Sequence, residues 1–146
     1  LLYFLFKYQR KLVKEIGDIK TFEGLPEALG ELKKRGVNLG VVTSNPRKNV
    51  RNFLKNNDIE CFDFIYSSLD YFNKSKMLEK AVKKFHMNKD SVVYVGDEVR
   101  DIKATKEAGI RVASVTWGYN FENVLTANNP DFIVSRPKEL LNLKMK

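Results

Sequence analysis

The sequence has little cysteine and histidine and no long apolar segment. Cys61 is the only cysteine among 146 residues, so no internal disulfide can form, and a reducing compartment such as the cytoplasm is expected. The longest apolar run extends from Leu1 to Phe6 and is far too short to cross a bilayer. The single histidine, His86, ends a predicted helix and is expected to face solvent. These absences exclude a disulfide scaffold and a spanning helix of ordinary length.

Acidic residues are also in deficit, 18 against 26 lysines and arginines, which gives a formal net charge of +8. A basic balance is compatible with nucleic-acid binding. The lysines are spread over several predicted helices, however, and no nucleic-acid-binding motif accompanies them. We therefore expect neither a nucleic-acid nor a membrane partner, but a positive field that attracts small phosphorylated substrates.

Strand-like and helix-like segments alternate along the chain. This alternation is typical of an α/β fold, a three-layer α/β/α arrangement in which helices cover both faces of a parallel sheet. Right-handed crossovers place the carboxyl ends of all strands at one edge. The predicted strands cover residues 37–43, 62–66, 92–95, 110–115 and 132–134, and the predicted helices begin near Pro26, Pro46, Ser75, Asp101, Phe121 and Pro137.

The first sixteen residues are ambiguous. Their spacing favours a helix over residues 1–16, but Leu1 to Phe6 alone could equally form a strand. The chain starts at Leu1 rather than Met, inside this element, so we expect it to be the later part of a longer protein.

Two carboxylates follow the apolar strand of residues 92–95. Asp97 comes directly after Gly96, and Asp101 stands four residues further on, at the start of the next predicted helix. Both could face one crevice, where their oxygens would suit a hard cation such as Mg²⁺. The alternative is a plain turn in which the first aspartate caps the helix.

Polar residues also follow two other predicted strands. The Thr43 hydroxyl and the amides of Ser44 and Asn45 could donate to an anion at a helix start, although an ordinary helix cap would use the same residue types. Lys74 precedes the next helix, where its charge opposes the helix dipole, so it could pair with a phosphate instead. Lys76 competes for this role, and a solvated lysine is the alternative. Together these residues predict a metal-dependent phosphoryl-transfer site.

The same residues carry a family resemblance that extends over about residues 21–143. The stretches Val41–Asn45 and Val95–Asp101, with Lys74 between them, resemble the second, third and fourth motifs of haloacid dehalogenase-like hydrolases. Residues 22–26, 116–120 and 130–134 are similar to the phosphoglycolate phosphatase-like branch. The resemblance implies a Rossmann-like core and a Mg²⁺-dependent phosphatase of small phosphorylated metabolites that forms an aspartyl-phosphate intermediate.

The resemblance also implies residue roles. Thr43 matches the phosphate-binding hydroxyl, with Ser44 and Asn45 beside it, and Lys74 matches the phosphate-binding lysine. Asp97 matches the metal-binding aspartate and Asp101 the second acid on the metal. The catalytic residues that the chain supplies would therefore be Lys74 and Asp97.

One departure from the family is large, because the chain contains no Asp-x-Asp-x-Thr motif and so lacks the nucleophile and the general acid. Residues 1–20 would be a remnant of the helical cap and its linker, and residues 21–146 the core without its first strand. We expect the chain by itself to bind Mg²⁺ weakly and to be inactive. The slot between residues 37–43 and 92–95 would be closed by direct pairing of these strands, by Leu1 to Phe6, or by another molecule, with self-association through the exposed edge as one outcome.

The missing nucleophile keeps a second class of function open, a non-catalytic α/β module that binds phosphate or regulates a partner. A receiver-like signalling domain is disfavoured, because residues 62–68 offer no phosphorylatable aspartate at the end of a middle strand. The substrate is not indicated, since in this family the cap does much of the selecting.

Overall fold

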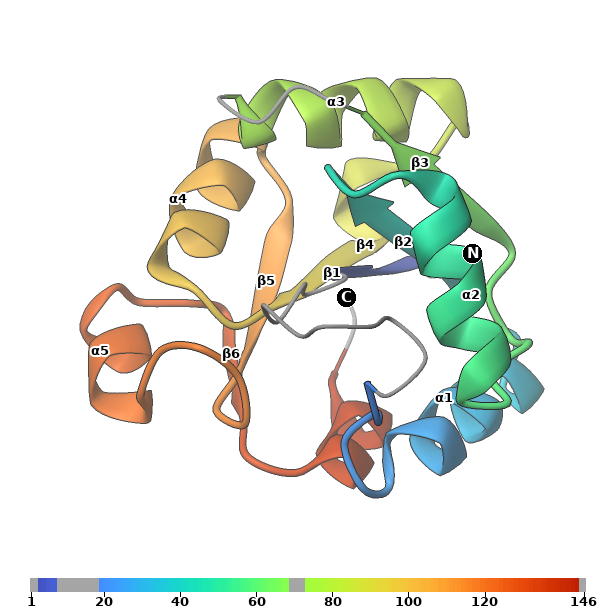
Figure 1. The fold of residues 1–146 in the computed structure, drawn as a ribbon. Coiled ribbons are helices and arrows are strands. Elements are labelled where there is room, and N and C mark those ends of the chain that lie inside the picture. Colours follow the sequence, from blue (N-terminus) through green and yellow to red (C-terminus); the bar gives the residue numbers. More distant parts are fainter. Residues whose placement is uncertain (1–2, 8–18, 69–72, 145–146) are drawn as a thin grey trace.

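The computed structural model describes residues 3–7, 19–68 and 73–144. Within these ranges the core is one parallel sheet of six strands in the order β3-β2-β1-β4-β5-β6 (Figure 1), which confirms the predicted α/β fold class. The strands are β1 (Tyr3–Lys7), β2 (Asn38–Thr43), β3 (Phe64–Ser67), β4 (Val92–Gly96), β5 (Arg111–Val115) and β6 (Phe132–Val134). The helices are α1 (Leu25–Lys34), α2 (Arg47–Asn56), α3 (Lys74–Lys84), α4 (Val99–Ala108) and α5 (Glu122–Ala127), with the 3-10 helices η2 (Lys89–Ser91) and η3 (Pro137–Asn142).

Strand β1 lies in the middle of the sheet, between β2 and β4. Phe6 stands opposite Val41 of β2 and opposite Val95 of β4. The alternative in which the N-terminal apolar run closes the slot is therefore confirmed for Tyr3–Lys7, and the helix expected there is wrong. A strand between two others pairs backbone groups on both sides, whereas a helix would leave two buried strand edges unpaired. The rest of that expected helix, residues 8–18, lies outside the described residues.

Two further expectations change with the placement of β1. Tyr3–Lys7 belong to the core sheet, so the expected division of the chain at residue 20 does not hold for them. The facing edges of β2 and β4 are both paired with β1, so this part of the sheet is not exposed and gives no basis for self-association.

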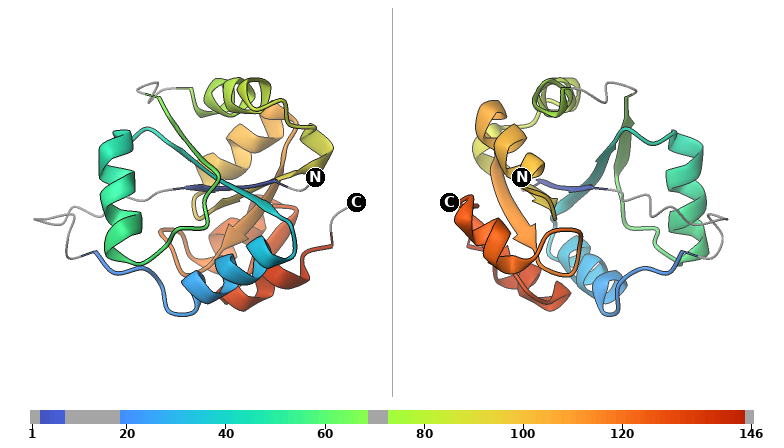
Figure 2. Two further views of the ribbon diagram at one scale, coloured as in Figure 1. Left: turned by 90° about the vertical axis from the view of Figure 1, so that its right-hand side faces the viewer. Right: turned by 60° about the vertical axis from the view of Figure 1, so that its left-hand side comes forward.

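Helices cover both faces of the sheet (Figure 2), and alternate residues of β4 show the two sides. Val92 and Tyr94 pack in a cluster with α3, α4 and α5, whereas Val93 and Val95 pack in a second cluster with α1 and η3. All five residues of β4 are buried, because helices cover the sheet on both sides. This explains why the sequence of the strand is a continuous apolar run.

The helices are short, and their ends differ slightly from the predicted ones. The segment that begins at Pro137 forms a 3-10 helix instead of the expected α-helix, and α4 begins at Val99, two residues earlier than predicted. Helix α3 has 11 residues, and no helix in the described ranges has the length and apolar character needed to cross a membrane.

The excess positive charge is concentrated on two helices. Helix α2 carries four basic side chains and no acidic one, and α3 carries five basic and one acidic. Their combined net charge of +8 equals the formal charge of the whole chain, so the remaining residues sum to zero. Both helices flank the edge strand β3, where Phe85 at the end of α3 stacks on Phe64 with ring centroids 3.9 Å apart.

Candidate active site

The carboxyl ends of the strands bring Thr43 and Asp97 to one edge of the sheet. Thr43 is the last residue of β2, and Asp97 directly follows β4. Val41 of β2 and Val95 of β4 both stand opposite Phe6 of β1. Thr43 and Asp97 each follow two residues later, so they lie at the same level along the strand direction. With neighbouring strands spaced about 4.8 Å apart, their backbones are about 10 Å apart across β1.

Asp97 is held by the loop that follows β5. Its Oδ2 accepts a hydrogen bond from the amide of Tyr119 at 2.5 Å, and its carbonyl oxygen accepts one from the amide of Asn120 at 3.1 Å. Only 3% of Asp97 is exposed. A side chain at Gly118 would overlap the Asp97 side chain, so glycine is needed there for the loop to approach so closely.

Asp101 lies in the first turn of α4 and is fully buried. Its Oδ2 accepts hydrogen bonds from the amides of Asp97 and Glu98, both at 3.1 Å, and its Oδ1 forms an ion pair with the Lys74 ammonium. A side chain at Gly96 would collide with this carboxylate. Asp101 therefore ties the helix, the end of β4 and the lysine together at one point.

Lys74 is the first residue of α3, whose N-cap is Asn73. The Asn73 side chain accepts a hydrogen bond from the amide of Lys76 at 3.0 Å and so fixes the helix start. The Lys74 side chain is 18% exposed and reaches Asp101, whereas Lys76 is exposed to solvent. Of the two lysines that the sequence offered, the fold therefore brings Lys74 to the carboxylates.

The segment after β2 is arranged differently from the prediction. The Thr43 hydroxyl oxygen accepts a hydrogen bond from the amide of Asn45 at 3.0 Å, and the Asn45 carbonyl accepts one from the Ser67 hydroxyl at 2.5 Å. The expectation that the Asn45 amide donates to an anion is therefore wrong in this arrangement, because a tight turn uses that amide. The Thr43 hydroxyl keeps its own hydrogen to donate, and the helix-cap alternative is wrong too, since the N-cap of α2 is Pro46.

Tyr94 lies beneath this site, in the middle of β4, and is fully buried. Its hydroxyl has no hydrogen-bond partner among the described residues. Burial, and then the nearby negative charges of Asp101, Asp97 and Glu98, raise the pKa of Tyr94 well above its ordinary value, so the phenol stays neutral. The ring faces the Lys74 ammonium, which lies 5.0 Å from its centroid.

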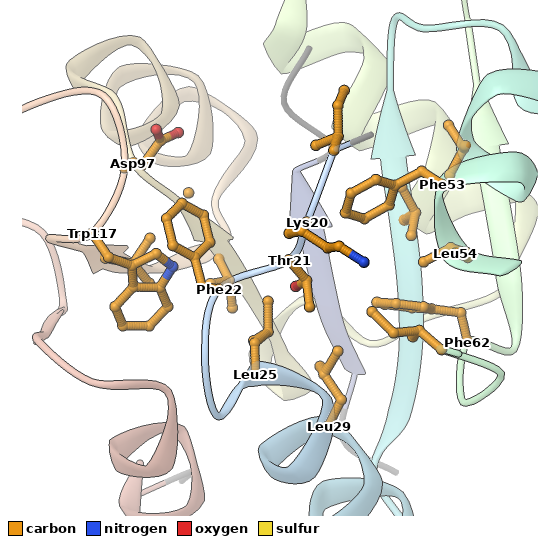
Figure 3. A pocket seen from close by; sticks show the side chains of 18 residues that line it. Lys20, Thr21, Phe22, Leu25, Leu29, Phe53, Leu54, Phe62, Asp97 and Trp117 are labelled. Atoms are coloured by element: carbon orange, nitrogen blue, oxygen red, sulfur yellow. The ribbon is translucent and has the colours of Figure 1, made fainter. Parts of the chain in front are cut away.

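An apolar cavity of about 170 Å³ opens beside the site (Figure 3). Asp97, Trp117 and Phe22 lie at one end, and Phe53 and other apolar residues of α2 and its neighbours lie at the other. The rings of Phe22 and Trp117 pack with centroids 6.3 Å apart. Because its walls are largely apolar, the cavity suits an apolar group better than a phosphate, and the polar chemistry remains at the strand ends.

The residues present fit a Mg²⁺ site only in part. Asp97 and Asp101 are buried carboxylates fixed by backbone amides, and oxygen is the donor that Mg²⁺ prefers. The described residues contain no group of three or more acidic, histidine or cysteine side chains placed to hold a metal. Two carboxylates would leave most of an octahedral shell to waters or to other groups.

Several contacts at the site escaped the sequence reasoning. Asn120 Oδ1 accepts a hydrogen bond from the amide of Val99 at 3.0 Å and so caps α4 from a distance of 21 residues. Tyr119 is 76% exposed, and its backbone amide donates a hydrogen bond to Asp97. The signal for this loop was the Gly-x-Asn spacing of residues 118–120, which could have been read as a close-approach turn. Glu98 and Arg100 pair with each other at the rim.

The all-parallel sheet with helices on both faces defines a Rossmann-like α/β protein, and the hydroxyl, the ammonium and the two carboxylates at its carboxyl edge form a candidate ligand site. A family model of haloacid dehalogenase-like hydrolases matches residues 2–115. The chain therefore belongs to the haloacid dehalogenase-like hydrolase family.

Individual relatives agree with this assignment. Over 136 residues the chain is 31% identical to the phosphoglycolate phosphatase of Synechococcus elongatus, a match that covers 92% of this chain and 64% of the relative. It is 30% identical to the pyrophosphatase PpaX of Bacillus velezensis over 129 residues, 86% of this chain and 60% of that one. A haloacid dehalogenase-like family protein of Streptococcus pneumoniae has a similar fold, with a TM-score of 0.80 at 26% identity over 88% of this chain and 62% of the other. These matches confirm the resemblance to the phosphoglycolate phosphatase-like branch, and this chain spans less than two thirds of each of these proteins.

Proposed function

We propose that this chain is the phosphate- and Mg²⁺-binding core of a phosphatase that hydrolyses small phosphate esters. The observation that carries the proposal is the buried ion pair between Lys74 and Asp101, next to the loop that fixes Asp97. Asp101 also caps the start of α4, but the buried ammonium has no such role, because a lysine in the first turn of α3 opposes the helix dipole. The names of the relatives, phosphoglycolate phosphatase and pyrophosphatase, support phosphate ester or anhydride hydrolysis as the reaction class.

In this proposal Thr43 and Lys74 bind the phosphate. The Thr43 hydroxyl and the Ser44 amide donate hydrogen bonds to phosphate oxygens, and the Lys74 ammonium neutralises their charge. Thr43 is 3% exposed and the Lys74 side chain 18%, so water competes little with these contacts. Charge-assisted hydrogen bonds are correspondingly stronger there than at an open surface.

Asp97 and Asp101 would hold Mg²⁺. When bound, the ion would act as a Lewis acid on a phosphoryl oxygen and offset the negative charge of the phosphate. The amides of Tyr119, Asp97 and Glu98 keep the two carboxylates oriented in its absence. Because two carboxylates complete only part of the shell, we propose that this chain alone binds Mg²⁺ weakly.

The chain contains no aspartate in the family's nucleophile motif, so we propose that the nucleophile comes from residues outside these 146. Its carboxylate oxygen would bond to phosphorus as the ester P–O bond breaks and the leaving oxygen takes a proton, and water would then hydrolyse the acyl phosphate. The chain by itself would bind phosphate without turnover.

Binding of inorganic phosphate tests the assigned residues directly. Calorimetric titration in millimolar Mg²⁺ should give a measurable Kd that rises about tenfold or more for Thr43→Val and for Lys74→Met, because each loses a hydrogen bond to a charged group. Lys76→Met is the matched control, because Lys76 lies in the same first turn of α3 but is exposed to solvent, and it should leave Kd unchanged. Equal loss in Lys74→Met and Lys76→Met would contradict the assignment.

The missing nucleophile motif favours an alternative function, a non-catalytic module that binds phosphate. An activity assay distinguishes this module from an enzyme. A protein that includes the residues encoded upstream should hydrolyse an aryl phosphate with Mg²⁺, and Asp97→Asn should abolish this activity. Absence of Mg²⁺-dependent turnover on a panel of phosphate esters would leave the module as the better reading.

We also propose a cytoplasmic location for the whole protein. Cys61 is a free, half-buried thiol, which is the ordinary state of cysteine in a reducing compartment. Fractionation of cells that express the full-length protein tests this, and recovery in an oxidising compartment would contradict it.

A further inference from the structure

The Lys74 ammonium has a second neighbour besides Asp101. It lies over the face of the Tyr94 ring, 5.0 Å from the centroid, within the range of a cation–π contact. The carboxylate of Asp101 pairs with the same ammonium. Two fixed groups from β4 and α4 thus hold the end of a side chain that starts on α3.

Tyr94 is one of the largest fully buried side chains among the described residues. Tyr94 is fully buried, and its strand is paired with β1 on one side and β5 on the other. Its side chain packs in the cluster that includes Leu78 of α3 and Ile102 of α4. In a close-packed interior such a ring has no space to shift, so it defines a fixed surface for the ammonium.

Lysine needs such a surface more than most residues do. Its four-carbon stem is flexible, and at the first position of α3 the helix dipole repels its charge. Asp101 alone is an uncertain anchor, because the same carboxylate is the proposed ligand of Mg²⁺. The aromatic face attracts the ammonium whether or not the carboxylate is shared with another cation.

We propose that Tyr94 is a positioning residue for Lys74, whose ring face holds the ammonium in place for a phosphate oxygen. Tyr94 itself does not reach the ligand. The inference rests on the proposed function for the identity of that ligand, but the placement of Lys74 over the ring is independent of it.

The hydroxyl of Tyr94 plays no part in this role. It has no hydrogen-bond partner among the described residues, and the ammonium is attracted by the face of the ring rather than by the hydroxyl. Phenylalanine at this position should therefore still hold the Lys74 ammonium, whereas an aliphatic residue should not.

Three variants test the proposal through NMR, calorimetry and thermal unfolding. Tyr94→Phe keeps the ring, Tyr94→Leu removes it, and Val112→Ala is the control, since Val112 is fully buried and stands opposite Tyr94 on β5. The NMR shifts of the Lys74 ε-methylene protons report the ring current directly, and calorimetry gives the Kd of inorganic phosphate.

We expect ring-current-shifted Lys74 ε protons in the wild type and in Tyr94→Phe, but not in Tyr94→Leu. The Kd of phosphate should change by less than about twofold in Tyr94→Phe and rise about tenfold in Tyr94→Leu. Val112→Ala should lower Tm while keeping the wild-type Kd. This pattern separates loss of the ring from loss of core volume.

The proposal is overturned if the wild type shows no ring-current shift, if Tyr94→Leu binds phosphate as tightly as the wild type, or if Val112→Ala weakens binding as much as Tyr94→Leu does. A Kd that rises equally in Tyr94→Phe and Tyr94→Leu also overturns it, because the hydroxyl would then be the active group. A wild type that has the shifted protons but binds no phosphate rejects the proposed function instead, and with it the ligand named here.

Discussion

The side chain of Asn120 accepts a hydrogen bond from the backbone amide of Val99 at 3.0 Å, so the loop after β5 caps the helix that carries Asp101. The backbone amide of the same residue, Asn120, donates a hydrogen bond to the carbonyl oxygen of Asp97. One residue therefore joins both carboxylate-bearing segments.

Asn120→Ala should lower the free energy of unfolding by about 1 kcal/mol, because the first turn of α4 loses a side-chain acceptor. For a domain of this size the expected fall in Tm is about 2 to 4 °C, measured by circular dichroism. Asn123→Ala, at an exposed position of α5, is the control and should leave Tm close to the wild-type value. An unchanged Tm in Asn120→Ala would show that water caps the helix equally well.

Gly118→Ala should lower the free energy of unfolding. The added methyl group would overlap Asp97, so the loop or the carboxylate must move, at a cost of about 1 to 3 kcal/mol. Gly30→Ala is the matched control, because Gly30 lies inside α1 with open space around it and should stabilise by about 0.5 to 1 kcal/mol. Urea denaturation of both variants checks the opposite signs, and equal effects would refute the packing argument.

The Lys74–Asp101 pair should behave as a buried ion pair in a double-mutant cycle. Lys74→Met or Asp101→Asn alone should cost about 3 kcal/mol, since each leaves a partner without its opposite charge in a site where the side chains are 18% and 0% exposed. The double variant should cost less than the sum of the two by at least about 1 kcal/mol.

The exposed pair between Arg35 and Glu31 provides the comparison cycle. Its side chains are 50% and 42% exposed, so its coupling should stay below about 0.5 kcal/mol. Both cycles are measured by urea denaturation in a buffer that contains a metal chelator. If the unfolding free-energy costs of the Lys74 and Asp101 variants are additive, solvent screens this buried pair as well as the exposed one.

Cys61 should react slowly with thiol reagents at neutral pH. Partial burial raises the pKa of its thiol, so less thiolate is present than in the unfolded chain, where cysteine ionises near about 8.5. Since the folded state holds this proton more tightly, stability should be constant below the unfolded pKa and fall as pH rises from there toward the folded pKa. Labelling rates of folded and urea-unfolded protein, compared from neutral to alkaline pH, check the direction, and equal rates would contradict it.

Local patterns predicted much of this site. The apolar run of β4 followed by Gly96 and Asp97 is a strand and a turn in adjacent residues, and Asp101 falls in the next helix by spacing alone. The choice between Lys74 and Lys76 needed the start of α3, which depends on how Asn73 caps it. That one-residue detail is below the precision with which helix ends can be read from sequence.

The features that escaped prediction depend on distant contacts. The sequence left a strand and a helix open for the first residues, and Tyr3–Lys7 form a strand because it pairs with both β2 and β4, which the local sequence does not show. The Asn45 amide is used by the Thr43 hydroxyl, a choice of side-chain rotamer that residue types do not fix. The amides of Tyr119 and Asn120 meet Asp97 across more than twenty residues.

Among the described residues no strand pairs with the outer edge of β3, and the two helices beside it carry a combined charge of +8. An open strand edge is a template for fibril-like pairing between molecules. Two copies that approach through β3 would bring these positive poles together, and the repulsion opposes contact over a distance of about 10 Å at 0.1 M ionic strength. The helices that give the chain its basic character thus also oppose strand pairing through β3, a protection that weakens as salt is added.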